Sequence, residues 1–376
     1  MMMLSLRIIP RQTYWANVQH ACKLLNTCYV QQNWKLLNMK PHSHMAHAAY
    51  HDLLRLLQDE AVSEIRGAPS LVTRGNKAYW YDSYRVGTKV HKAYIGEDTP
   101  ALRARMERVT GLKAEAKSRR AERARLIRIL RAEGLMDMDR ATGSLLNAMA
   151  KAGVFRLGGT VIGTHAFRLY EGVLGLRYSF DQMAQTGDID IASFERLSLA
   201  LDDVVSPPLQ KVLGDFAFDP VPGLEKATTW RWRQSQSGLL VEFLMPSFEE
   251  DESIRSLPAL GVQAQALHHL NYLLAEPIKA AALYQSGVLV QIPRPERFAI
   301  HKLIVAARRR SDDHLKSSKD RAQAAFLIEA LSEDRPDDLA QAYADAKALG
   351  PRWRERLNQS LRRIPETANR LARLST

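Results

Sequence analysis

The stretch TGDIDIAS, residues 186–193, places two carboxylates on a segment whose other residues suit a buried strand. Aspartate is depleted from strands, yet Asp188 and Asp190 alternate here with Ile189 and Ile191. Residues i and i+2 of a strand point to the same face about 6.5 Å apart, so the aspartates project together while the isoleucines enter the core. Two such carboxylates repel each other unless they are protonated or bridged by cations. The segment is therefore either a turn leading into a strand with a polar face, or a metal site.

Two further features of the chain favour the metal site. Upstream, RLGGT predicts a short strand that runs into Gly158 and Gly159 at the start of a helix, where glycines let a ligand approach and helix N–H groups favour phosphate. Downstream, Glu242 interrupts the apolar strand GLLVEFLMP, and an edge-strand carboxylate is the alternative explanation for it alone. Paired oxygen ligands suit Mg²⁺, and two such ions can activate an attacking oxygen and stabilise a leaving one in phosphoryl or nucleotidyl transfer.

This ordered set of a glycine pair, a DID strand and a strand carboxylate resembles the nucleotidyltransferase superfamily, whose catalytic core is similar to that of DNA polymerase β. Within it, the chain is most similar to bacterial families that include relatives of the AbiEii-type toxin enzymes. Three segments carry the resemblance: RLGGTVIGTHAFRLYEGVLGLR from residue 156, QTGDIDIA from residue 185, and PRPERFAIHKLIVAARR from residue 293, which a Lys-Asp pair follows. The resemblance covers roughly residues 141–330 and implies an α+β fold (α/β mixed), with a polymerase-β-like core and a small mixed sheet.

The resemblance also implies roles for individual residues. Asp188, Asp190 and Glu242 would be the catalytic acids and the ligands of Mg²⁺, with two ions expected and Mn²⁺ as an alternative. The implied contacts to a nucleoside triphosphate are Gly158, Gly159, Thr160, Lys302 and Lys319, the last beside Asp320. Two features depart from the family pattern. Gly159 and Asp188 are 29 residues apart, which requires an extra turn or loop, and the third acid is Glu rather than the more frequent Asp.

Upstream of the resembling region, residues 66–97 combine aromatic and basic side chains. The text RGAPSLVTRGNKAYWYDSYRVGTKVHKAYIGE predicts a β-hairpin with a glycine-containing loop. Its tyrosines either stack on nucleic-acid bases or pack on the helix that follows.

A long basic helix is expected next, with Thr99 as its N-cap, Pro100 in its first turn and its end near Gly134. Between Arg103 and Arg131 there are eleven Lys or Arg and three Glu, so this segment carries 11 − 3 = +8 of the chain's net charge of +12. A solvated helix face is one explanation of this charge. The other is a surface that holds a phosphate backbone. In that case the candidate nucleic-acid contacts are Arg119, Arg120, Arg123 and Arg125.

The composition is that of a globular protein, 46% hydrophobic and 25% charged. No segment approaches the ~18 apolar residues of a membrane span. The first residues lack a signal-peptide pattern, and Cys22 and Cys28 are the only cysteines. We therefore expect a cytoplasmic protein with no membrane partner, and the positive charge favours a polyanion such as RNA.

Four regions are expected: a leader over residues 1–45, with Met39 and Met45 as alternative starts; the hairpin and basic helix over 46–140; the nucleotidyltransferase core over 141–250; and a mostly helical domain over 251–376. The expected enzyme is a Mg²⁺-dependent nucleotidyltransferase that moves a nucleoside monophosphate from an NTP to an acceptor hydroxyl, on RNA such as a tRNA 3′ end, as in the toxin-type relatives. One alternative is nucleotidylation of a protein or small-molecule hydroxyl. The other is a non-catalytic toxin–antitoxin-type binding module, against which three intact acids argue.

Overall fold

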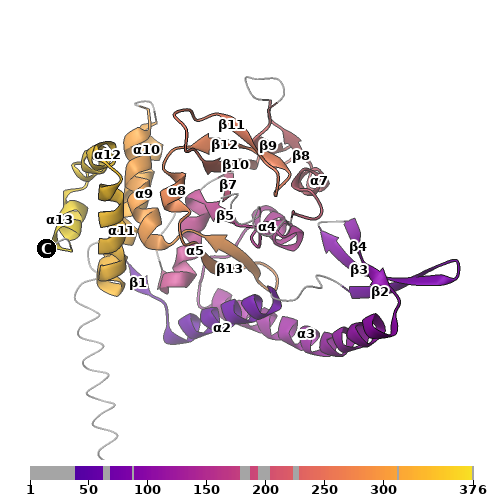
Figure 1. The fold of residues 1–376 in the computed structure, drawn as a ribbon. Coiled ribbons are helices and arrows are strands. Elements are labelled where there is room, and N and C mark those ends of the chain that lie inside the picture. The colour runs from indigo at the N-terminus through magenta and orange to yellow at the C-terminus, as the bar shows by residue number, and fades with distance from the viewer. Residues whose placement is uncertain are drawn as a thin grey trace, which may run out of the picture.

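The computed structural model describes residues 39–61, 68–86, 89–177, 187–193, 204–222, 228–310 and 313–374. A central mixed sheet has C-terminal helices on one side and a smaller sheet on the other, and a long helix runs beneath it (Figure 1). The expected α+β fold class is thereby confirmed.

Seven strands form the central sheet: β5 (Gly159–Ile162), β7 (Asp188–Ser193), β8 (Phe218–Pro220), β9 (Arg231–Gln234), β10 (Leu240–Pro246), β11 (Ile254–Leu257) and β12 (Val262–Leu267). The main path runs β11-β12-β10-β7-β5, and β9 pairs with both β8 and β10. Strands β7, β10 and β12 are parallel, whereas β5 is antiparallel to β7 and β9 is antiparallel to β10.

Alternation along β7 and β10 separates core residues from polar ones. Ile189, Ile191, Val241 and Phe243 are fully buried, as the sequence predicts for the two isoleucines. Each apolar side chain buried in this way contributes roughly 1.5–3 kcal/mol, which holds the two strands rigidly in register. The helices next to the sheet are α4 (Arg140–Ala152), α5 (Gly163–Leu174), α7 (Leu209–Asp215) and α8 (Leu270–Leu273).

The C-terminal helices α9 (Pro295–Arg308) and α10 (His314–Asp334) pack on α5 through aromatic contacts. Phe167 of α5 stacks on Phe298 at a ring-centroid distance of 6.3 Å and meets Phe326 edge-on at 6.0 Å. The elements of this region are the antiparallel pair β13 (Ile278–Ala282) and β14 (Val288–Ile292), followed by α9, α10, α11 (Pro336–Ala348), α12 (Pro351–Leu361) and α13 (Pro365–Arg373).

The N-terminal part differs in one respect from expectation. Residues 68–97 form an antiparallel meander of three strands rather than a two-stranded hairpin. The long helix is confirmed, with Thr99 as its N-cap and Pro100 in its first turn. The elements here are β1 (Lys40–Pro41), α2 (His44–Ala61), β2 (Ala68–Arg74), β3 (Lys77–Val86), β4 (Lys89–Glu97), α3 (Pro100–Ala132) and β6 (Leu176–Arg177), which pairs with β1.

Two of the expected boundaries fall inside structural units. Residues 39–45 are part of the fold rather than of a leader, because Met39 is buried and His42 pairs with Glu171 at 3.0 Å. The boundary at residue 250 cuts the central sheet, because β11 and β12 extend it beyond β10. Most of the leader, residues 1–38, lies outside the described residues.

Within the described ranges, no helix combines the length and the apolar character that a bilayer crossing demands.

Candidate active site

Three neighbouring strands, β7, β10 and β9, place one polar row across the centre of the sheet. Asp190 on β7 lies opposite Glu242 on β10, with Ile162 of β5 on its other side. Glu242 in turn lies opposite Arg231 of β9. Asp190 and Glu242 are half-buried, while Asp188 is exposed two residues earlier on the same strand face. The three predicted acids are thus brought together by strand register.

The electrostatics of this row disfavour two full negative charges on the central pair. Burial raises the pKa of Asp190 to about 6; the charge of Lys302 opposes this shift and that of Asp188 adds to it. Burial and the charge of Asp190 raise the pKa of Glu242 to about 7, against the opposing charge of Arg231. A proton shared between the two carboxyl groups relieves their repulsion, and a divalent cation can do the same.

These acids fit an open magnesium site rather than a closed cage. In the described part of the chain, no group of three or more His, Cys, Asp or Glu side chains is placed so that it could hold a metal ion by itself. Mg²⁺ commonly takes only one or two carboxylates and completes its shell with water and phosphate oxygens. Two half-buried carboxylates with a third beside them match that donor chemistry.

The glycine that approaches the acids is Gly163, which the sequence analysis overlooked. Gly163 starts α5 with φ +64°, and a Cβ atom added there would lie 2.1 Å from Oδ2 of Asp190. The Asp190 carboxylate therefore rests against the glycine backbone at the N-terminus of a 12-residue helix. The GT pair that follows β5 was the available signal, and its distance from Asp188 is 25 residues rather than 29.

Gly158 and Gly159 stand at the other end of β5, which corrects the expectation that they open the helix. Gly159 pairs with Ser193, three residues along the ladder from the pairing of Ile162 with Asp190. At about 3.4 Å per residue, that separates Gly159 from the acids by roughly 10 Å. Gly159 instead allows the chain to pack closely against Val154, because a Cβ atom there would lie 2.5 Å from Cγ1 of Val154.

Thr160 is likewise internal. Only 1% of its surface is exposed; its hydroxyl donates to the Gly158 carbonyl at 3.1 Å and accepts from Nε2 of Gln291 at 3.0 Å. Because both hydrogen bonds are made within the protein, Thr160 holds the start of β5 in place and is not a contact for a phosphate.

The predicted lysines gather around one buried carboxylate. Asp320 is 2% exposed and accepts from Nζ of Lys302 at 2.6 Å and from Nε of Arg309 at 2.6 Å. The positive charges of Lys302 and Arg309 both act to lower the pKa of Asp190. Burial and the charge of Lys302 lower the pKa of Lys319, whereas Asp320 and Asp188 oppose that shift. Lys302 and Lys319 therefore belong to the neighbourhood of the acids, with Asp320 orienting Lys302.

Arg231 is a further residue of the site, beyond those to which the family resemblance assigns a role. It lies opposite Glu242, and its guanidinium carbon is 4.5 Å from the centre of the Trp230 ring. Stacking on the ring holds the cation beside the acidic row. The alternation of tryptophan and arginine in TTWRWRQ was the available signal.

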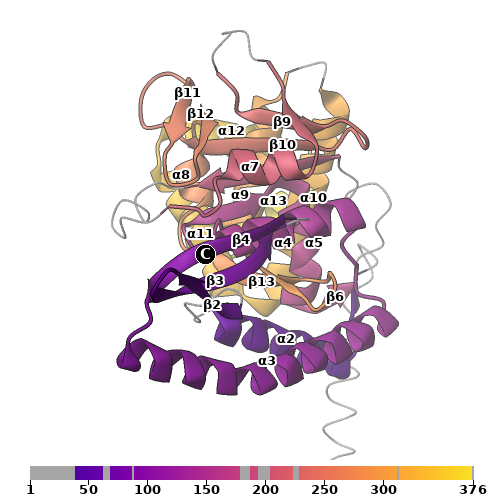
Figure 2. The ribbon, with the colours of Figure 1, turned by 90° about the vertical axis from the view of Figure 1, so that its right-hand side faces the viewer.

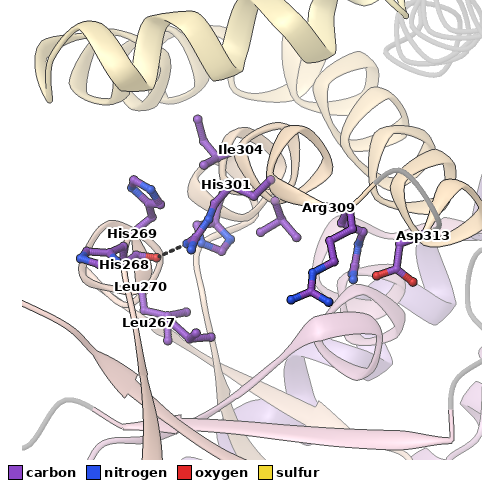
Figure 3. A pocket seen from close by; sticks show the side chains of 11 residues that line it. Leu267, His268, His269, Leu270, His301, Ile304, Arg309 and Asp313 are labelled. Atoms are coloured by element: carbon purple, nitrogen blue, oxygen red, sulfur yellow. Dashed lines mark hydrogen bonds between the residues drawn. The ribbon is translucent and has the colours of Figure 1, made fainter. Parts of the chain in front are cut away.

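A cavity of about 460 Å³ adjoins this cluster through Arg309 (Figure 3). His268 and His269 line it together with His301 of α9. Burial, with the charges of Arg356 and Arg308, lowers the pKa of His269 to about 4, and burial with His269 and Lys302 lowers that of His301 to about 3. Neutral imidazoles, aliphatic side chains and arginines therefore line this cavity, and two of the arginines are paired: Arg308 with Glu252 at 2.7 Å and Arg309 with Asp320 at 2.6 Å.

The four arginines expected to bind nucleic acid do not share one surface. Arg123 is 5% exposed, pairs with Glu60 and donates to the Ser286 carbonyl at 3.2 Å, so its guanidinium faces inward. Arg120 and Arg125 are exposed, and Arg125 pairs with Glu122 at 2.7 Å. Arg119 is half-buried. The expectation that Arg123 contacts nucleic acid was therefore wrong, because a buried cation cannot reach a phosphate backbone.

Two family models match the chain. The model described as Nucleotidyltransferase matches residues 140–348, which contain the acidic row, Gly163 and the Lys302–Asp320 pair. The model described as Domain of unknown function (DUF6788) matches residues 49–104, which contain most of α2, the three-stranded sheet and the start of α3. No curated protein and no solved structure matches the chain.

Proposed function

The chain belongs to the nucleotidyltransferase family, and from this membership we propose that it transfers a nucleoside monophosphate from an NTP to an acceptor hydroxyl on RNA, in a Mg²⁺-dependent reaction. The observation that carries the proposal is the row of Asp190, Glu242 and Arg231 beside the backbone of Gly163. Carboxylates for a cation lie next to a helix N-terminus for phosphate, which is the combination that a triphosphate substrate requires.

Asp188, Asp190 and Glu242 are the residues that would hold Mg²⁺, which supplies charge neutralisation and Lewis-acid activation of the phosphates. The N–H groups at the start of α5, around Gly163, face the phosphates, and Lys302 adds a positive charge. The acceptor oxygen forms its bond to the α-phosphorus as the bond from that phosphorus to pyrophosphate breaks, and a carboxylate of the row receives the hydroxyl proton. Positioning and charge neutralisation supply most of the rate enhancement.

The test incubates the protein with each α-labelled NTP and Mg²⁺, once with total RNA and once with an RNase-treated lysate. Label in RNA is the expected result. Label found only in protein or in small molecules would show that the acceptor is one of these and not RNA. Absence of transfer to any acceptor, together with a lack of NTP binding, would refute the enzymatic proposal and favour a non-catalytic binding module.

Gly163→Ala is expected to impair both transfer and folding. A positive φ costs an alanine about 1–2 kcal/mol. The added Cβ also displaces the Asp190 carboxylate, and a misplacement of about 1 Å can cost roughly 100-fold in rate. Urea unfolding and single-turnover transfer measure the two effects. The matched control is Gly214→Ala in α7, where an added Cβ meets nothing within 4 Å. Equal activity of Gly163→Ala and wild type would exclude Gly163 from the site.

The RNA acceptor predicts a specific salt dependence for exposed arginines of α3. Arg120→Gln with Arg125→Gln is expected to weaken RNA binding and to reduce the slope of log K against log salt by about 0.7 per lost phosphate contact on single strands. Arg123→Gln serves as the contrast, because loss of its inward contacts to Glu60 and Ser286 should lower the melting temperature instead. An unchanged slope in the double variant would remove α3 from the RNA surface.

The proposal includes two further points: the chain is related to the AbiEii-type toxin enzymes, and separate parts of it bind the acceptor and carry out the reaction. In this arrangement, the unit around residues 49–104 holds the acceptor and residues 140–348 carry the chemistry. If the chain is a toxin of this type, its transfer reaction should arrest growth. Growth arrest by the wild type but not by a variant lacking an acid of the row is the expected result on induced expression, and arrest by both would argue against the relationship.

A further inference from the structure

The three-stranded sheet β2-β3-β4 turns a row of tyrosines away from the rest of the protein. Alternation along β3 directs Asp82 and Tyr84 inward: both are 6% exposed, and the Tyr84 hydroxyl donates to the Ser206 carbonyl at 3.3 Å. Tyr79 and Tyr81 have the opposite parity and therefore point outward. Tyr94 of β4 lies directly opposite Tyr81 and is 60% exposed. In Figure 2 the sheet lies in front of α4, which contacts β3.

The outward tyrosines form one aromatic surface. The ring of Tyr94 is 5.7 Å from that of Tyr81 and 6.2 Å from that of Tyr79, measured between centroids. Such pairs keep one another in fixed orientations. A sheet face that packs into the protein core is covered by other elements. On this face, by contrast, 60% of Tyr94 is exposed.

Cations surround these rings on the same side of the sheet. Arg74, Arg85 and Lys92 are exposed at outward positions of the three strands. The acidic neighbour Glu97 is neutralised by Lys77 at 3.0 Å. We call Arg74, Tyr79, Tyr81, Arg85, Lys92 and Tyr94 the tyrosine face.

The positive charge continues from the tyrosine face toward the body of the protein. Burial and the nearby charges of Arg120 on α3 and Arg85 lower the pKa of Lys151 on α4. Three elements, α3, β3 and α4, therefore bring cations close together beside the sheet. Neighbouring cations of this kind attract a bound polyanion.

We propose that the tyrosine face binds single-stranded RNA, with bases stacked on Tyr81 and Tyr94 and phosphates beside Arg74, Arg85 and Lys92. Stacking on aromatic rings requires unpaired bases, which a duplex does not offer, and surrounding cations follow the backbone. The choice of RNA over DNA rests on the proposed function, in which RNA supplies the acceptor hydroxyl. The face itself is outside the residues that match the nucleotidyltransferase model.

The experiment measures binding of the full-length protein to a fluorescein-labelled 12-nucleotide single-stranded RNA by anisotropy, without NTP or Mg²⁺. Tyr81→Ala with Tyr94→Ala is expected to weaken binding about tenfold or more, because each stacked ring is lost. Tyr81→Phe with Tyr94→Phe keeps the rings and should bind like wild type. Lys92→Ala should reduce the salt slope by about 0.7. The matched control is Leu71→Ala, which shortens an exposed apolar side chain on the opposite side of β2.

Several results would overturn the proposal. Wild-type affinity in the folded double alanine variant would do so, as would an equal loss in Leu71→Ala. Duplex RNA bound as tightly as the single strand would exclude stacking, and single-stranded DNA bound as tightly would exclude RNA as the specific partner. Failure of the enzymatic proposal is distinguishable, because the binding assay contains neither NTP nor metal. An Asp190 variant that binds RNA but transfers nothing separates the two.

Discussion

Asp190→Asn is expected to reduce nucleotidyl transfer by at least about 100-fold while leaving the fold intact. The side chain sits at the centre of the polar row, opposite Glu242 and against the backbone of Gly163. Asparagine preserves its shape but removes the charge that would neutralise a bound cation. Because burial already disfavours the ionised form of Asp190, the variant should unfold at the same or a higher temperature than wild type.

Single-turnover transfer with labelled NTP and thermal unfolding measure these two effects on the same preparation. The control is Asp219→Asn on β8, which makes the same chemical change at an exposed position that accepts from the Ser235 hydroxyl at 2.7 Å. Asp219→Asn should retain full transfer. Undiminished transfer by Asp190→Asn would remove this residue from the catalytic set.

Asp320→Asn is the second large expected effect, and it concerns stability first. Asp320 neutralises Lys302 and Arg309 together at a position with 2% exposure. Removing one partner of a buried ion pair leaves an uncompensated charge and typically costs about 3–5 kcal/mol. Asp334→Asn on the same helix is the control, because its exposed pair with Arg335 contributes at most about 1 kcal/mol.

The double variant Asp320→Asn with Lys302→Met tests whether the unpaired lysine causes the loss of stability in Asp320→Asn. If the unpaired buried lysine is responsible, removing it should restore part of the lost free energy of unfolding, and transfer should remain low because the positive charge near Asp190 is gone. Denaturant unfolding of the four proteins supplies the comparison. A loss in Asp320→Asn no larger than in Asp334→Asn would show that the pair is not a structural support.

The same pair predicts how stability depends on pH. Burial alone would raise the pKa of Asp320, but Lys302 and Arg309 outweigh it and hold the pKa below its usual value. A group whose pKa is lower in the folded state contributes stability above its unfolded pKa of about 3.9, and that contribution is lost as pH falls through the folded value. The difference in unfolding free energy between wild type and Asp320→Asn should therefore shrink below about pH 4.

The sequence predicted the acidic part of the site well because strand periodicity is local. Ile189 and Ile191 had to be buried, so Asp188 and Asp190 had to face together, and the observed burial agrees. Glu242 could be selected because a charge in an otherwise apolar strand requires an explanation. The α3 helix was predicted for the same local reason, from its cap and its first-turn proline.

The glycine motif was misassigned because two glycine-containing turns follow each other within six residues, and either could open the helix. The sequence shows no preference between Gly158-Gly159 and Gly163. The antiparallel pairing of β5 with β7 decides it, since that register brings the end of β5, not its beginning, to Asp190. Arg123 was misassigned in a similar way, because charge alone does not reveal that α2 and the β13–β14 turn cover one side of α3.

The sequence by itself determined local features: acids on two strands, isoleucines buried behind them and a basic N-terminal region. Local patterns suffice for this because side-chain direction on a strand or helix follows from spacing alone. Only the tertiary structure decided which residues meet. It set Arg231 against Glu242, joined Lys302 and Arg309 through Asp320, and turned the tyrosines outward, because these contacts link segments far apart in the chain and depend on register and packing.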